Sequence, residues 1–274
     1  MPPPPRCHVP LDSAPAMVSS AAMLDASSLA LAAGAGVLGG AMNALAGGGT
    51  FATMPALIAL GLPGSIANAT SNVALQPGAI ASAWAYRRGL GPLGGLPIRL
   101  LAAITFVSGL LGSLLLVWTP STLFDVIVPW LLLVAFLAIA FGRSAARWLH
   151  DRVTIGPAAL VVAQVLLGIY GGYFGGGVGM MVTATYGLLV GQSVKSMAAP
   201  RTLMLATANS AAAIVFVATG MVAWAACIPM ILGSILGGWL GAKLGARLTP
   251  GQIRAWTLVV TFGVTVAFFV RAYR

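Results

Sequence analysis

Charged side chains are scarce in this sequence. Only 7% of its 274 residues are charged, and four carboxylates stand against fourteen Lys and Arg. Soluble proteins of ordinary composition carry about 25% charged residues. Because hydrophobic residues make up 59% of the chain and recur in long runs along it, the composition excludes a soluble globule. It indicates an integral membrane protein with several membrane-spanning segments.

Groups that carry catalysis or bind metals are also scarce. Cys7 and Cys227 are too few and too far apart for a disulfide framework or a thiolate metal site. The aspartates lie at or beyond the ends of the apolar runs, so none is placed for a proton relay or a Ca²⁺ site within the membrane. The sequence has no H-E-x-x-H, G-x-S-x-G or Walker A motif. We therefore expect no enzyme, no metal site and no cofactor.

Ten apolar segments follow a Pro-rich N-terminus, residues 1–26, which we predict to be disordered. They cover residues 27–46, 50–62, 66–86, 96–118, 124–142, 155–174, 178–190, 202–220, 222–242 and 253–271. Most are long enough to cross a hydrocarbon core of about 30 Å as a helix that rises about 1.5 Å per residue. Segments 50–62 and 178–190 are too short to do so.

A glycine triplet precedes each short segment, Gly47–Gly49 in one case and Gly175–Gly177 in the other. Two short segments at matching places indicate an internal repeat of five segments. We predict a first transmembrane repeat over 27–142, a basic cytoplasmic linker over 143–154 and a second transmembrane repeat over 155–274.

Basic residues occupy alternate gaps between the segments. The third, fifth, seventh and ninth gaps carry Lys or Arg, among them Arg87, Arg147, Lys195 and Arg247, whereas the even-numbered gaps carry none. By the positive-inside rule the odd gaps are cytoplasmic and both termini lie outside. An odd number of segments per half turns the second half upside down. The predicted fold class is therefore an all-α polytopic membrane protein of two inverted-topology repeats, and the net charge of +10 reflects topology rather than binding to nucleic acid.

The glycine triplets predict broken helices. Unpaired backbone groups cost several kcal/mol each in hydrocarbon, so a break persists only inside protein or beside a water-filled cavity. Half-helices that begin at Thr50 and Val178 would direct free N–H groups and positive dipole ends into that cavity, which favours an anion. The alternative is that the glycines only permit close helix packing.

Polar residues gather around both breaks. They are Asn43, Thr50, Thr53, Thr70, Ser71, Asn72 and Gln76 in the first half and Gln164, Thr183, Thr185, Thr202, Thr207, Asn209 and Ser210 in the second. Such residues in membrane helices face a partner or a cavity. Hydrogen bonding between helices without a role in transport is the alternative. Arg201 and Lys195 are candidates to attract an anion, or else they extend to the membrane interface as ordinary topology determinants.

Two further glycine patterns are interpreted as structural. Residues 34–39 fit the dinucleotide-binding pattern G-x-G-x-x-G, but they lie inside an apolar run with no strand before it. Gly233, Gly237, Gly241 and Gly245 recur every four residues on one face of a helix, which predicts a tight packing seam.

Three motifs in the first half together resemble the TauE/SafE family, also called the 4-toluene sulfonate uptake permeases. They are NALAGGGTFATMPALIALGL, the A-x-x-T-S of residues 67–71 and the A-Y-x-R-G of residues 85–89. The resemblance covers about residues 34–271 in two copies, of which the first is the clearer, and Arg201 stands where the family commonly has Thr. It implies a transporter of sulfite, sulfonates or related small organic anions across the cytoplasmic membrane.

We therefore expect a multi-pass secondary transporter of small anions in the cell membrane. It would work by alternating access, with the two halves rocking about a midplane site. An anion channel, a membrane scaffold and a membrane enzyme are the alternatives, and a homo-oligomer is left open. The expected substrate-binding residues are Asn43, Gly47, Gly48, Gly49, Thr50, Thr70, Ser71, Gly175, Gly176, Gly177, Arg201 and Thr202.

Overall fold

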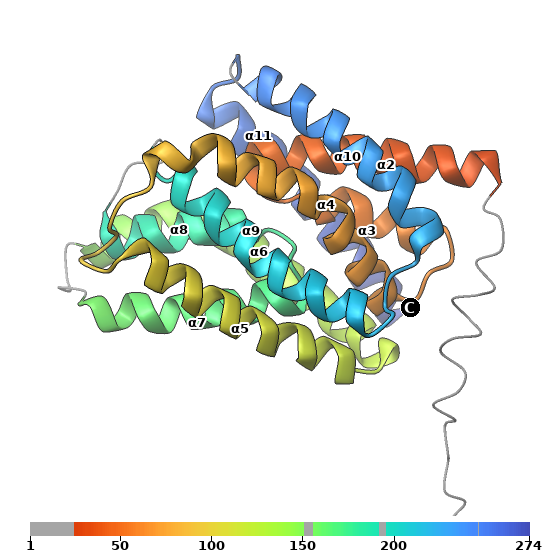
Figure 1. Ribbon diagram of the computed structural model, residues 1–274, viewed down its shortest axis with the longest axis horizontal. Coiled ribbons are helices and arrows are strands. Elements are labelled where there is room, and N and C mark those ends of the chain that lie inside the picture. Colours follow the sequence, from red (N-terminus) through yellow and green to blue (C-terminus); the bar gives the residue numbers. More distant parts are fainter. Residues whose placement is uncertain (1–24, 151–155, 192–195, 246) are drawn as a thin grey trace, which may run out of the picture.

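The structure of the protein is a computed structural model that describes residues 25–150, 156–191, 196–245 and 247–274 (Figure 1). The helices of the first half are α2 (Ala26–Ala46), α3 (Thr50–Ala59), α4 (Gly64–Tyr86), the 3-10 turn η1 (Arg87–Gly89), α5 (Ile98–Trp118) and α6 (Ser121–His150). Those of the second half are α7 (Pro157–Tyr173), α8 (Val178–Val190), α9 (Ala198–Ala218), α10 (Trp224–Gly245) and α11 (Pro250–Tyr273). The described part of the chain is thus helical nearly throughout.

Within the described residues, six helices are long and apolar enough to cross a membrane. They are α2, α5, α6 over Ser121–Gly142, α9, α10 and α11 over Gly251–Tyr273. The polytopic all-α class expected from the sequence is confirmed at this level. Residues 1–24 of the N-terminal segment expected to be disordered lie outside the described residues, and so does Lys195. The last two residues of that segment, Asp25 and Ala26, form the start of α2.

Several element boundaries differ from the sequence prediction. Helix α3 ends at Ala59, because Gly61 adopts a left-handed φ of +88° and Pro63 follows. Helix α9 begins four residues early, with Pro200 in its first turn, where a missing N–H costs nothing. Helix α6 continues to His150, so most of the segment predicted as a linker extends a helix instead.

Glycines allow α2 and α10 to pack closely against each other along the first of two helix seams. A Cβ atom on Gly237 of α10 would lie 1.9 Å from the carbonyl oxygen of Val37 on α2, and one on Gly40 would lie 2.1 Å from that of Ser234. Gly233 and Gly241 meet α2 in the same way. The predicted packing seam is therefore confirmed, and Gly36 of the 34–39 pattern belongs to its other side, since a Cβ there would meet the backbone of Met230.

A second seam joins α5 to α7. A Cβ on Gly172 would lie 1.9 Å from the carbonyl oxygen of Gly109, and one on Gly112 would lie 2.1 Å from that of Ile169. The first helix of each half therefore packs on the fourth helix of the other half, α2 on α10 and α7 on α5 (Figure 1). The third helices contact each other, α4 with α9, and so do the fifth, α6 with α11.

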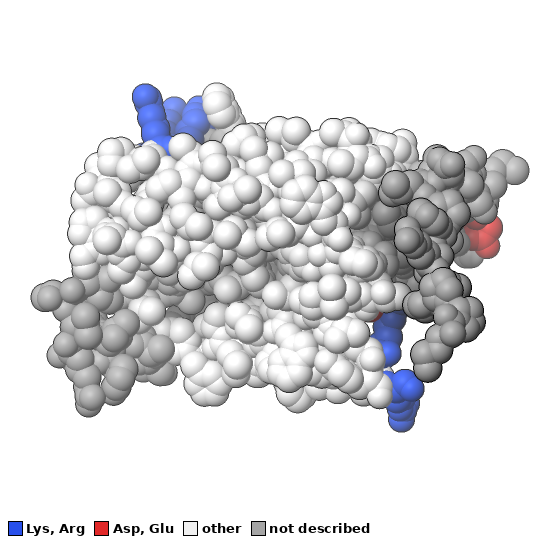
Figure 2. All heavy atoms as spheres, turned by 90° about the horizontal axis from the view of Figure 1, so that it is seen from below, with Lys and Arg blue, Asp and Glu red and all other residues white. Residues whose placement is uncertain are grey.

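The charged and apolar surfaces fit a protein embedded in a membrane. Figure 2 shows Lys and Arg at two opposite ends of the visible face, with an uncharged belt between them. Large apolar side chains such as Val259, Leu232 and Trp118 are more than three-fifths exposed. An exposed apolar surface of this extent is typical of contact with lipid rather than water. At one end Asp25 caps α2, and hydrogen bonds from Ser28 and Ser27 lower the pKa of its carboxyl to about 2.

Candidate functional site

The helices are interrupted at both glycine triplets. Helix α2 ends at Ala46, Gly47 adopts a left-handed φ of +78°, and α3 begins at Thr50. Helix α7 ends at Tyr173, and α8 begins at Val178 after two left-handed glycines. A residue with a Cβ atom pays about 1–2 kcal/mol for this conformation. Glycine therefore permits a break that most other residues would resist.

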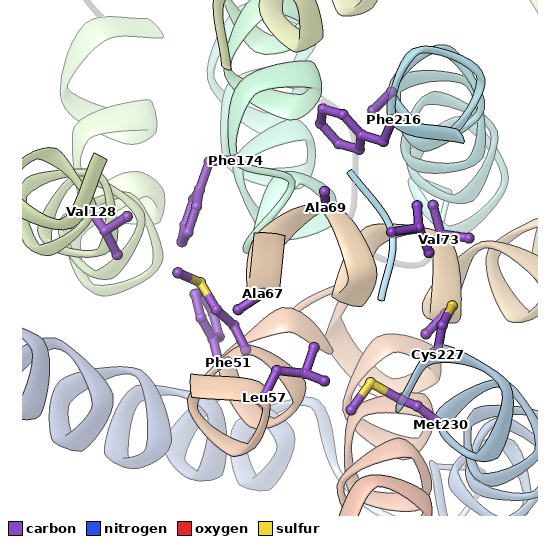
Figure 3. Close-up of a cluster of buried hydrophobic side chains, with 14 of the residues drawn as sticks. Phe51, Leu57, Ala67, Ala69, Val73, Val128, Phe174, Phe216, Cys227 and Met230 are labelled. Carbon is purple, nitrogen blue, oxygen red and sulfur yellow. The ribbon is translucent and has the colours of Figure 1, made fainter. Parts of the chain in front are cut away.

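The two interruptions touch each other inside the protein. A Cβ on Gly47 would lie 2.8 Å from Cα of Gly179 in the first turn of α8, and one on Gly177 would lie 2.9 Å from Cζ of Phe51 in α3. All six triplet glycines are buried. Phe51 and Phe174, one from each half, point toward one another at this junction (Figure 3). The structure thus brings together segments that are about 130 residues apart in the chain.

The first paired backbone donors of α3 are those of Phe51 and Ala52. Phe51 donates to the carbonyl of Gly48, and Ala52 donates to that of Gly49. Among the residues that the structure describes, nothing accepts from the N–H groups of residues 48–50. The hydroxyl of Thr50, a residue only 5% exposed, has no partner in this part of the chain either. Asn43, half-buried on the preceding turn, has its Cβ 3.1 Å from where a Cβ on Gly49 would lie.

The start of α8 has the same arrangement. Met180 and Met181 both donate to the carbonyl of Gly177, and Gly175 donates to that of Tyr170. Within the described residues, no acceptor serves the N–H groups of residues 176–179. Consecutive free N–H groups at a helix N-terminus are the usual backbone site for an anion.

Arg201 lies beside the second of these N-termini. It belongs to the first turn of α9 and is half-buried, and its Cγ would lie 3.5 Å from a Cβ on Gly179. The carbonyl oxygen of Ala46 would lie 3.4 Å from the same Cβ position on Gly179. No carboxylate of the described residues forms an ion pair with Arg201. The stem of the Arg201 side chain therefore lies close to both breaks, and its cation has no carboxylate partner among the described residues.

The other predicted site hydroxyls form hydrogen bonds between helices or within one helix. Thr70 accepts a hydrogen bond of 3.0 Å from the N–H of Ala223, just before α10. The Ser71 hydroxyl bonds that of Thr53, which also donates to the carbonyl of Gly49. Thr202 donates to carbonyls of its own helix. These three sites fit the alternative of hydrogen bonding between or within helices better than direct contact with a substrate.

Replacing Thr70 with valine is expected to destabilise the protein by about 1–3 kcal/mol, because a buried N–H of Ala223 loses its acceptor. Thermal unfolding of the purified protein measures this loss. Thr219→Val is the matched control, since the Thr219 hydroxyl bonds only carbonyls of its own helix. Equal melting temperatures for the two variants would contradict a role for Thr70 at the α4–α10 contact.

Sequence reasoning missed several buried polar residues. Asn68 donates to the carbonyl of Tyr173 at 3.0 Å, where α7 ends. Tyr186 donates to Gln164, whose amide donates in turn to Thr105. Asn68 lies four residues before Asn72, so a helical-face analysis of the polar positions could have found it. Tyr186 and Thr105 carry no comparable signal.

A cavity of about 600 Å³ opens between the end of α4 and the start of α9. Tyr86 and Arg88 line one side, and Ser196 and Pro200 line the other. Arg201 follows directly in the chain. The cavity lies at the end of the molecule that the positive-inside rule assigns to the cytoplasm.

Comparison with known proteins agrees with these features. The sequence profile of the family described as Sulfite exporter TauE/SafE matches residues 32–268. The "Probable membrane transporter protein YfcA" of Escherichia coli K12 is 28% identical over 198 residues, which cover 72% of this chain and 73% of that protein. A "Probable membrane transporter protein" of Haemophilus influenzae is 28% identical over 225 residues, covering 82% and 88%. No solved structure matches the chain.

The profile covers both halves and both glycine triplets, and the relatives are named as membrane transporters rather than enzymes. The chain therefore belongs to the sulfite exporter TauE/SafE family of membrane transporters.

Proposed function

We propose that the protein is a secondary transporter of small anions, of the sulfite or sulfonate type, and that it binds them where the two glycine triplets meet. The observation that carries this proposal is the pair of touching helix N-termini whose backbone N–H groups have no acceptor in the described residues. Free N–H groups and two positive dipole ends suit a compact anion. Sulfite and sulfonate oxygens would accept from N–H groups of both halves at once.

The proposed mechanism is alternating access by two inverted halves. The helix contacts support it, because they are the same when the two halves are exchanged. The contact of α2 with α10 corresponds to that of α7 with α5. The other two contacts, α4 with α9 and α6 with α11, each join helices that occupy the same place in their halves. Contact positions also advance together along α2 and α10, and along α5 and α7, so each pair runs in parallel. A site shared between two such halves is exposed to one side at a time when they rock.

Arg201 would raise the local concentration of anions near the cytoplasmic cavity. The Arg201→Gln variant is expected to take up sulfite more slowly at low concentration, and the salt dependence of its uptake should be weaker, because a screened attraction has been removed. Arg99→Gln, a change at the start of α5, serves as the charge-matched control. Identical salt dependence in the wild type and the Arg201 variant would remove Arg201 from the site.

Counterflow in proteoliposomes tests transport itself. Vesicles loaded with unlabelled sulfite should accumulate labelled sulfite transiently and saturably, since a carrier exchanges substrate across its site. An anion channel would give flux without counterflow, and a scaffold or enzyme would give neither. A counterflow series with sulfonates and carboxylates then defines the substrate class.

A further inference from the structure

Three buried side-chain amides form a row on one face of α4. Asn68, Asn72 and Gln76 are spaced by four residues, and none is more than 8% exposed. Residues at this spacing are neighbours on a helix surface. The row faces α7 and α9, because its amide nitrogens donate to Tyr173, Asn209 and Ala206.

The oxygen atom of each of these amides has no donor among the described residues. The hydrogen bonds fix the orientation of two of the amides. Asn68 and Gln76 must turn nitrogen toward the backbone carbonyls of Tyr173 and Ala206, so their oxygens face the other way. A buried acceptor without a donor costs about 1–3 kcal/mol. Three such acceptors on one helix face favour a ligand that supplies positive charge or hydrogen-bond donors.

Two of the amides flank the C-terminal end of α7. Asn68 binds the carbonyl of Tyr173, the last residue of that helix, and Nδ2 of Asn72 lies 2.9 Å from where a Cβ on Gly175 would lie. The last carbonyls of a helix lack helical donors and form the negative end of its dipole. The end of α2 has a different neighbour, because the carbonyl oxygen of Ala46 and Cγ of Arg201 both lie within 3.5 Å of the Cβ position of Gly179.

We propose that Asn68 and Asn72, beside the C-terminal end of α7, bind a monovalent alkali cation that is transported together with the anion. This proposal rests on the proposed function for its transport role, but not for the binding itself. Amide and carbonyl oxygens are ligands for hard cations, and the absence of a carboxylate from the row favours a single positive charge over Ca²⁺ or Mg²⁺.

Because Asn72 lies beside Gly175 of the second triplet, the cation would be bound close to the proposed anion site. The C-terminal end of α7 lies beside both asparagines, and such helix ends contribute to cation sites in other transporters with discontinuous helices. The pair of ions carries less net charge than the anion alone. Its passage through a low-dielectric interior therefore costs less.

Binding is tested by thermal unfolding of the purified protein without any added substrate. NaCl, KCl and choline chloride are compared at equal ionic strength. Na⁺ or K⁺ should raise the melting temperature saturably relative to choline, because an ion that binds only the folded state stabilises it. Identical curves in all three salts would mean that water occupies the amide oxygens, and would overturn the proposal.

Variants assign the effect to the row. Asn68→Leu and Asn72→Leu should weaken the apparent cation affinity at least tenfold, whereas Asn72→Asp should strengthen it, because a carboxylate replaces a neutral ligand. Gln164→Leu is the matched control, as Gln164 is also a buried amide but both of its polar atoms are bonded. If the Leu variants fail to fold, an unchanged affinity in Asn72→Asp overturns the proposal by itself.

Sulfite counterflow with and without the effective cation separates this inference from the proposed function. Sulfite counterflow at the same rate with and without the cation would overturn the coupling of cation and anion transport and leave the proposal of anion transport intact. Cation binding without any counterflow would overturn the transport proposal and leave the site in place. A thermal response seen only with anions that carry hydroxyl or ammonium groups would assign the oxygens to the substrate and overturn the cation site.

Discussion

Gly47→Ala is expected to lower the free energy of unfolding by about 2–5 kcal/mol and to abolish transport. About 1–2 kcal/mol comes from the left-handed backbone at φ +78°. The rest comes from contact, because the new Cβ would lie 2.8 Å from Cα of Gly179, which is backbone and cannot rotate away. Relief requires the two half-helix N-termini to separate, and the proposed anion site is formed by their contact.

Gly61→Ala is the matched control for Gly47→Ala. Gly61 has a similar φ of +88° but no atom within 4 Å of its Cβ position. The control should therefore lose only the free energy that the left-handed backbone costs. The further fall in melting temperature in Gly47→Ala, at roughly 2–4 °C per kcal/mol, measures the cost of the contact with Gly179. Gly48→Ala should be milder than Gly47→Ala, since its Cβ would chiefly displace the flexible end of Met180. Equal losses in Gly47→Ala and Gly61→Ala would refute the close contact between the breaks.

Gly237→Ala is expected to destabilise the protein by about 3 kcal/mol, while alanine at the adjacent Gly238 should stabilise it slightly. The Gly237 Cβ would lie 1.9 Å from the carbonyl oxygen of Val37, so α2 and α10 must move apart along the seam. At Gly238 the nearest atom is 3.9 Å away, and replacing glycine with alanine in a helix gains about 0.5–1 kcal/mol.

Thermal unfolding of the two α10 variants gives the measurement. Changes in stability of opposite sign at Gly237 and Gly238 cannot arise from helix propensity, because helix propensity favours alanine at both positions. Destabilisation of similar size at Gly237 and Gly238 would therefore mean that the seam does not pack as described.

The positions of the glycines predict much of the backbone conformation at the candidate site. Three of the six triplet glycines adopt left-handed φ values, and the half-helices begin at Thr50 and Val178 as predicted. Such predictions are reliable because glycine is the residue that tolerates this conformation, and because a short apolar segment cannot span the hydrocarbon. The contact between the two breaks carries no such local signal.

Side-chain roles were harder to predict from the sequence. Thr70 and Ser71 were expected to bind substrate, yet their hydroxyls bond Ala223 and Thr53. A hydroxyl beside a helix break looks the same in sequence whether it faces a ligand or another helix.

The sequence by itself determined the membrane class, the helix breaks and the glycine seam on α10, because each follows from local chemistry: apolar length, backbone freedom and residue size. Only the tertiary structure decided which helix lies against that seam, that Gly47 meets Gly179, and that the amides of α4 face the end of α7. These are contacts between residues more than 100 positions apart. They depend on how two halves with little similarity in sequence interlock, which neither half specifies alone.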